Sequence, residues 1–227
     1  MDLSTIEASL EQRYRAATLT LTEIGHAVGA PSVDAAAAIE LQARELRQGG
    51  RAIDQDLVTS AGKPGKSPSD QRLVIALMQL SQQVGLIANQ FELIAEQLRE
   101  IDPHVIDRHG AAASLAEMAE LASVQLSAAL AAFTTRDLKL AYTLEQQDNL
   151  LDQLNRDVFE ATLDQDPARD QRELALRHMI IARCLERIGD NAVDIAEQAA
   201  YVITTELREF TDASKPRLPR RPHPTGG

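Results

Sequence analysis

Proline divides this chain into long segments that favour helices. The prolines at positions 31, 64, 68, 103 and 167 separate runs rich in Ala, Leu, Glu, Gln and Arg, and four more prolines fall in the last twelve residues. These five residue types have strong intrinsic helix propensity. No segment shows the alternation of β-branched residues that is typical of a strand. The sequence therefore predicts an all-α fold.

Six helices are expected between these breaks, because proline cannot continue a helix. The second is expected to fray around Gly49-Gly50, and the sixth to continue as far as Phe210. In the sixth, apolar residues recur at three-, four- and seven-residue spacing, which is the pattern of a packed helix. The expected ranges are about 4–28, 32–50, 70–101, 111–133, 136–163 and 168–210.

The two halves of the chain resemble each other at a constant offset of 101 residues. The tetrad Ile94-Ala95-Glu96-Gln97 recurs as Ile195-Ala196-Glu197-Gln198, and at the same offset Asn89 falls on Asp190. A shared offset over a whole helix, with the same order of three long helices, indicates an internal repeat. Long helices joined by short loops pack antiparallel. The expected architecture is two tandem three-helix bundles.

Charge separates the body of the chain from its end. The net charge is −11, and residues 214–227 carry four basic residues and no acid, so the remainder carries −15. Such a body repels phosphate backbones, and we expect no nucleic-acid partner. The proline-rich basic end cannot support a core of its own. We therefore divide the chain into a first bundle (1–102), a second bundle (103–213) and a disordered basic tail (214–227).

Cysteine content and hydropathy favour a cytoplasmic protein. The single cysteine, Cys184, excludes an intramolecular disulfide. No apolar run reaches the 18 residues of a membrane span, so no direct membrane insertion is expected. The start, Met1-Asp2-Leu3-Ser4, lacks the basic and apolar stretches of a signal peptide.

Carboxylates are concentrated on one face of the sixth expected helix. At about 100° per residue they share a narrow sector, where like charges four residues apart repel. A metal ion or an arginine would relieve this repulsion. The alternative is an exposed acidic face paired with Arg183 and Arg187, which is the commoner arrangement. The four carboxylates belong to Glu186, Asp190, Asp194 and Glu197.

A second pair of carboxylates with the same four-residue spacing lies in the preceding helix, at Asp148 and Asp152. Antiparallel neighbours can bring the two pairs together as hard oxygen ligands. Such ligands suit Mg²⁺, Mn²⁺, iron or Ca²⁺ better than zinc. From the residues alone, a metal cluster and a solvated surface remain equally good interpretations.

The stretch 186–197, Glu-Arg-Ile-Gly-Asp-Asn-Ala-Val-Asp-Ile-Ala-Glu, resembles the signature of the PhoU family, regulators of bacterial phosphate uptake. Residues 181–185 match the lead-in to that signature, and residues 148–154 are similar to the family's other acidic motif. The resemblance implies two three-helix bundles, each with a carboxylate metal site. The ligands that it implies here are Asp148, Asp152, Glu186 and Asp190, with Asp194 and Glu197 as further candidates.

The first half departs from this pattern. At the offset of 101 residues, Gly85 and Asn89 replace Glu186 and Asp190. The stretch where the first central-helix pair is expected, residues 43–48, offers only Glu45, and Glu40 belongs to another register. We therefore expect one metal cluster per chain, of Fe, Mn, Mg or Zn.

The resemblance also implies a function. It predicts a cytoplasmic, non-enzymatic regulator that binds the ATPase subunit of the phosphate ABC transporter and a sensor histidine kinase. Its effect would be indirect negative regulation of phosphate-starvation genes, and a homodimer is compatible with it. Two alternatives remain open: a carboxylate-bridged metal enzyme and a metal-free helical interaction protein. The lack of paired Glu-x-x-His ligands disfavours the enzyme.

Overall fold

The computed structural model describes residues 2–163 and 168–210, apart from the side chains of residues 145–149 and 162–163. These residues form helices joined by short connections and contain no strand, so the all-α prediction is confirmed. The helices are α1 (Leu3–Gly29), α2 (Val33–Ala61), α3 (Pro68–Glu100), α4 (Ala111–Thr135), α5 (Leu138–Leu163) and α6 (Arg169–Thr204).

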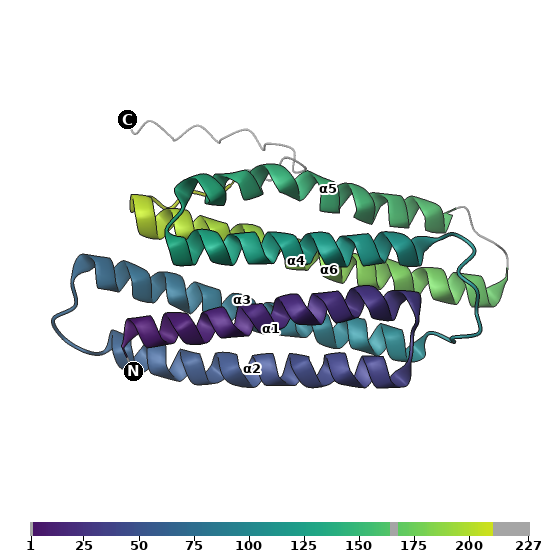
Figure 1. The fold of residues 1–227 in the computed structure, drawn as a ribbon, viewed down its shortest axis with the longest axis horizontal. Coiled ribbons are helices and arrows are strands. Elements are labelled where there is room, and N and C mark those ends of the chain that lie inside the picture. Colours follow the sequence, from purple (N-terminus) through teal and green to yellow (C-terminus); the bar gives the residue numbers. More distant parts are fainter. Residues whose placement is uncertain (1, 164–167, 211–227) are drawn as a thin grey trace, which may run out of the picture.

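The helices form two antiparallel three-helix bundles that lie side by side along the long axis of the molecule (Figure 1). Between the bundles, α1 packs against α4 and α3 packs against α6. One continuous hydrophobic cluster includes buried residues from all six helices. The bundles therefore share a core, and their division into separate domains at residue 102 stays a prediction.

Side chains next to the helix starts explain where several helices begin. Asp2 accepts a hydrogen bond from the backbone N–H of Thr5 and caps α1. Ser67 and Asp70 form a reciprocal capping box at the start of α3, with Pro68 as its first residue. These contacts satisfy backbone donors that have no partner within the helix.

The prediction that the second helix frays around Gly49-Gly50 is wrong, because α2 continues to Ala61. Both glycines lie where neighbouring groups come close. A Cβ atom at Gly49 would lie 2.3 Å from Nε of Arg13, and the carbonyl of Gly50 accepts a hydrogen bond of 3.3 Å from Ser81. Burial of the following turns, including Leu57, outweighs the helix propensity that glycine lacks.

The sixth helix ends at Thr204 rather than at the predicted Phe210. Thr205 has φ 68°, and its N–H donates to the carbonyl of Tyr201, so the chain leaves the helical path there. The following segment brings the ring of Phe210 to 5.5 Å from the ring of Tyr142 on α5, measured between centroids.

By length and composition, α4 is apolar enough to cross a membrane, although half of its most apolar window is buried inside the structure. The same test is passed by core helices, so the finding is weak evidence for a span. The buried side of α4 includes Leu115, Met118, Leu126 and Phe133.

Candidate metal centre

Glu186 is the central carboxylate of the acidic face of α6. Its side chain is only 12% exposed, and its Oε1 accepts a hydrogen bond from the Arg183 guanidinium one turn earlier. Its other oxygen, Oε2, is buried and has no hydrogen-bond partner among the described residues. A buried carboxylate oxygen without a donor is costly unless a proton or a cation satisfies it.

The environment of Glu186 also changes its pKa. Burial first, and then the neighbouring charges of Asp190 and Asp152, raise the pKa of Glu186 from 4.5 to about 7, although Arg183 opposes the shift. Glu186 therefore lies in a site whose negative charge is not fully compensated. Perturbation by both burial and like charges is typical of functional sites, although structural networks also show it.

Asp152 brings a carboxylate from α5 towards this site. It is 8% exposed, and its Oδ2 lies 4.0 Å from Nη1 of Arg156 on the next turn. Asp190 is half-buried one turn after Glu186 on α6. The fourth predicted ligand, Asp148, lies in α5, but its side chain is outside the described residues.

Gly189 permits the close approach of α5 and α6 beside these acids. A Cβ atom at this position would lie 2.3 Å from Cδ2 of Leu151 and 2.9 Å from Oε1 of Gln125. A larger residue at this position would force the buried side chains of Leu151 and Gln125 to move. Sequence analysis missed this role, for which a glycine inside a helix between two acids was the available signal.

The two further candidates contact other groups. Asp194 is exposed and accepts a hydrogen bond of 2.9 Å from Nε2 of Gln83, which belongs to α3 of the first bundle. Oε1 of Glu197 accepts a hydrogen bond of 2.6 Å from the N–H of Phe210 and so holds the segment that follows α6. In this structure both carboxylates contact structural partners, and their role as ligands stays a prediction.

The donor set suits a hard cation, but the described residues do not complete a site. Oxygen ligands and the unpartnered Oε2 of Glu186 are what Mg²⁺, Mn²⁺ or iron requires. However, within the described part of the chain no three histidine, cysteine or carboxylate side chains are grouped so that they could hold a metal ion. A metal centre here therefore depends on Asp148 as well.

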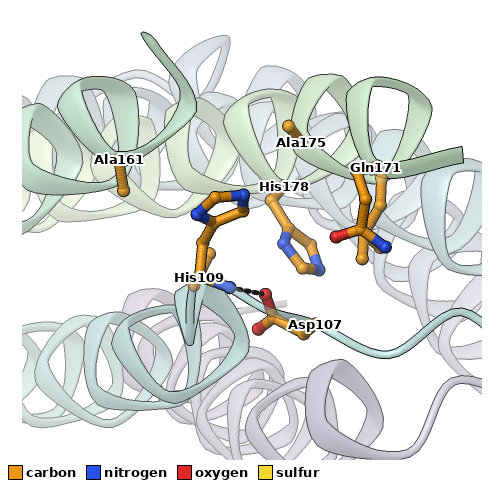
Figure 2. A pocket seen from close by; sticks show the side chains of 8 residues that line it. Asp107, His109, Ala161, Gln171, Ala175 and His178 are labelled. Atoms are coloured by element: carbon orange, nitrogen blue, oxygen red, sulfur yellow. Dashed lines mark hydrogen bonds between the residues drawn. The ribbon is translucent and has the colours of Figure 1, made fainter. Parts of the chain in front are cut away.

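A second polar cluster lies where the connection between the bundles meets the start of α6. His178, buried at 2% exposure, lines a small pocket with His109, Asp107 and Gln171, and the two imidazoles lie near one another (Figure 2). Asp107 accepts hydrogen bonds from the N–H groups of His109 and Ala112, so it caps α4.

Burial lowers the pKa of His178, and the charge of Asp107 partly opposes this effect. The cleft around His178 encloses about 260 Å³ of empty space, part of it open to solvent. The imidazole of His178 is therefore a packed side chain of α6.

Comparison with known proteins agrees with this architecture. The family model described as the PhoU domain matches residues 115–199, which include most of α4–α6. The chain is 32% identical over 84 residues to the phosphate-specific transport system accessory protein PhoU homolog 1 of Thermotoga maritima, covering 36% of each chain. It is 28% identical over 142 residues to the Methanothermobacter thermautotrophicus protein of the same description, covering 60% of this chain and 63% of that one.

Solved structures share the fold over most of the chain. The phosphate transport system regulatory protein PhoU from Streptococcus pneumoniae superposes with a TM-score of 0.78 at 22% identity, covering 91% of this chain and 97% of that one. PhoU from Pseudomonas aeruginosa gives a TM-score of 0.72, also at 22% identity, with 90% and 94% covered. The PhoU domain model thus matches the second half of this chain, and the chain is similar in sequence to PhoU homologues and shares the fold of PhoU structures.

Proposed function

We propose that this protein is a regulatory accessory of a phosphate transport system. In this proposal it acts in the cytoplasm, without enzymatic activity, on the transporter ATPase subunit and on a sensor histidine kinase. It would thereby repress the phosphate-starvation response when phosphate is plentiful. Similarity to these relatives supports the phosphate-transport role, because they are described as phosphate-specific transport system accessory proteins.

The proposal includes a metal centre on the second bundle, and the buried unpartnered Oε2 of Glu186 is the observation that carries it. Asp148, Asp152, Glu186 and Asp190 would hold the cation, which would neutralise their mutual repulsion. Arg183 and Arg156 each already contact one of these acids from the same helix. The cation would thus tie α5 to α6, which the two arginine contacts do not do.

Partner capture by the folded bundles, rather than by the tail, follows from the charge distribution. The chain carries −11 in all and −15 without residues 214–227, so long-range attraction favours basic partner surfaces and weakens with salt. The tail itself lies outside the described residues. We expect a chain that ends at residue 213 to retain the partners of the full-length protein.

Affinity purification from phosphate-replete and phosphate-starved cells tests this function. The full-length protein should capture the transporter ATPase or the kinase, and the paired changes Glu186→Gln and Asp152→Asn should weaken capture. Glu96→Gln is the control, because Glu96 is an exposed acid on α3 outside the candidate site. Failure to recover either partner under both conditions would contradict the assignment.

A further inference from the structure

In the first bundle, the guanidinium of Arg47 joins α2 to α3. Its Nη2 donates hydrogen bonds of 2.6 Å to Oδ1 of Asn89 and of 2.6 Å to Oε2 of Glu92. The side chains of Arg47 and Glu92 are 31% and 33% exposed, so both are largely shielded from water. Charge-assisted hydrogen bonds at this length are among the stronger polar contacts in proteins.

The internal repeat shows what these partners correspond to in the second bundle. At the offset of 101 residues, Asn89 corresponds to Asp190 and Gly85 corresponds to Glu186. Arg47 therefore binds the first-bundle counterpart of a candidate metal ligand. It reaches that counterpart from α2, the central helix of its bundle, just as α5 supplies Asp152 in the second bundle.

The charges balance differently in the two bundles. In the second, Arg156 contacts Asp152 and Arg183 contacts Glu186, each from within the same helix. Oε2 of Glu186 is nevertheless buried without a hydrogen-bond partner among the described residues. In the first, one guanidinium, one carboxylate and one neutral amide form a balanced set across two helices. The residues of the first bundle therefore do not fit a metal ion.

We propose that the Arg47 guanidinium takes the place of a metal ion in the first bundle. It supplies a permanent positive charge between α2 and α3, whereas the second bundle depends on an exchangeable cation between α5 and α6. The exchangeable cation of the second bundle rests on the proposed function, but the role of Arg47 does not. Arg47 is thus the residue that confines metal binding to one half of the chain.

Replacing Arg47 and its neighbours in the first bundle by acids tests the proposal. In a chain with the second bundle disabled by Asp152→Asn and Glu186→Gln, we would introduce Arg47→Asp, Gly85→Glu and Asn89→Asp, which gives the reversed chain. The space at Gly85 permits the change, because a Cβ atom there would meet no other atom within 4 Å. Bound Mn²⁺ per chain would be counted by electron paramagnetic resonance and elemental analysis, with helix content followed by circular dichroism.

The disabled chain should bind no Mn²⁺, and the reversed chain should bind about one ion and melt at a higher temperature when Mn²⁺ is added. The matched control keeps Arg47 but carries Gly85→Glu and Asn89→Asp. It should bind Mn²⁺ at least tenfold more weakly (roughly 1.4 kcal/mol), because the guanidinium already pairs with the new acids. A folded reversed chain without Mn²⁺, or a control that binds equally well, would overturn the proposal. If the wild type bound no Mn²⁺, only the second-bundle site would be refuted.

Single variants keep the proposal testable if the reversed chain does not fold. Arg47→Gln should lower the melting temperature by about 2–4 °C, the shift expected for a partly shielded ion pair in a chain of this size. Arg47→Lys keeps the positive charge and should recover part of that loss. An unchanged melting temperature in Arg47→Gln would show that α2 and α3 need no cation at this position.

Discussion

Neutralising Glu186 should stabilise this protein at alkaline pH in the absence of metal. In the folded chain its carboxylate is buried beside Asp190 and Asp152, which raises its pKa from 4.5 to about 7. In the unfolded chain the same group is solvated and ionises near its ordinary value. Glu186→Gln keeps an oxygen that can accept the hydrogen bond from Arg183 but cannot become charged.

These two pKa values determine the pH range over which stability changes and the direction of the change. Between pH 4.5 and about 7 the folded state binds more protons at Glu186 than the unfolded state does, so the free energy of unfolding falls as pH rises. Below pH 4.5 both states are protonated, and well above pH 7 both are ionised. The shift corresponds to about 3 kcal/mol, at roughly 1.4 kcal/mol per pH unit. The side chain is only 12% exposed, so solvent screening reduces this figure little.

Urea denaturation in EDTA at pH 5, 6, 7 and 8 measures the effect. The variant should match the wild type near pH 5 and exceed it by about 2–3 kcal/mol at pH 8, or roughly 4–12 °C in melting temperature. Glu96→Gln, at an exposed position on α3, controls for the removal of one negative charge. The difference between variant and wild type is the informative quantity, because His178 contributes an opposite slope below pH 6.5.

A difference that stays constant from pH 5 to pH 8 would refute the reasoning, and so would a variant that is less stable at pH 8. Either result would mean that water or a counter-charge already compensates Glu186 in the folded state. Saturating Mn²⁺ provides an internal check. A bound cation favours the ionised carboxylate, so the wild type should lose its fall in stability with rising pH.

Three further predictions concern packing, protonation and metal. Gly189→Ala should destabilise the fold by about 1–3 kcal/mol in urea titration, because its Cβ atom would overlap Leu151. Gly85→Ala, with open space around it, should be neutral or stabilising by up to about 1 kcal/mol. Burial lowers the pKa of His178, so stability at this group is present above pH 6.5 and lost as pH falls below it. His178→Asn should flatten that loss in melting curves between pH 7 and pH 5. Mn²⁺ should raise the melting temperature of the wild type and raise that of Asp190→Asn less, whereas an unaltered wild-type curve after EDTA treatment would identify the acids as a solvated face.

Periodicity predicted the helices well because each helix buries a stripe of apolar residues over many turns. It did not predict the path of α2 through Gly49-Gly50, because that continuity depends on contacts with α1 and α3. Helix spacing placed Asp194 and Glu197 on the face of Glu186. Their observed partners, Gln83 and Phe210, come from another bundle and from the segment after α6. The spacing of residues along one helix does not determine such long-range hydrogen-bond partners.

The two bundles place the same kind of helix pair under different electrostatic constraints. In the first, Arg47 supplies its positive charge as part of the fold, so its contribution does not require a bound cation. In the second, Glu186 retains a buried oxygen that has no donor in the described part of the chain, which folding alone would disfavour. A solvated acidic face would not show this combination, because water would satisfy the oxygen and hold the pKa near its ordinary value. We therefore expect the stability of the second bundle to depend on a bound cation, and the stability of the first bundle to depend on Arg47 instead.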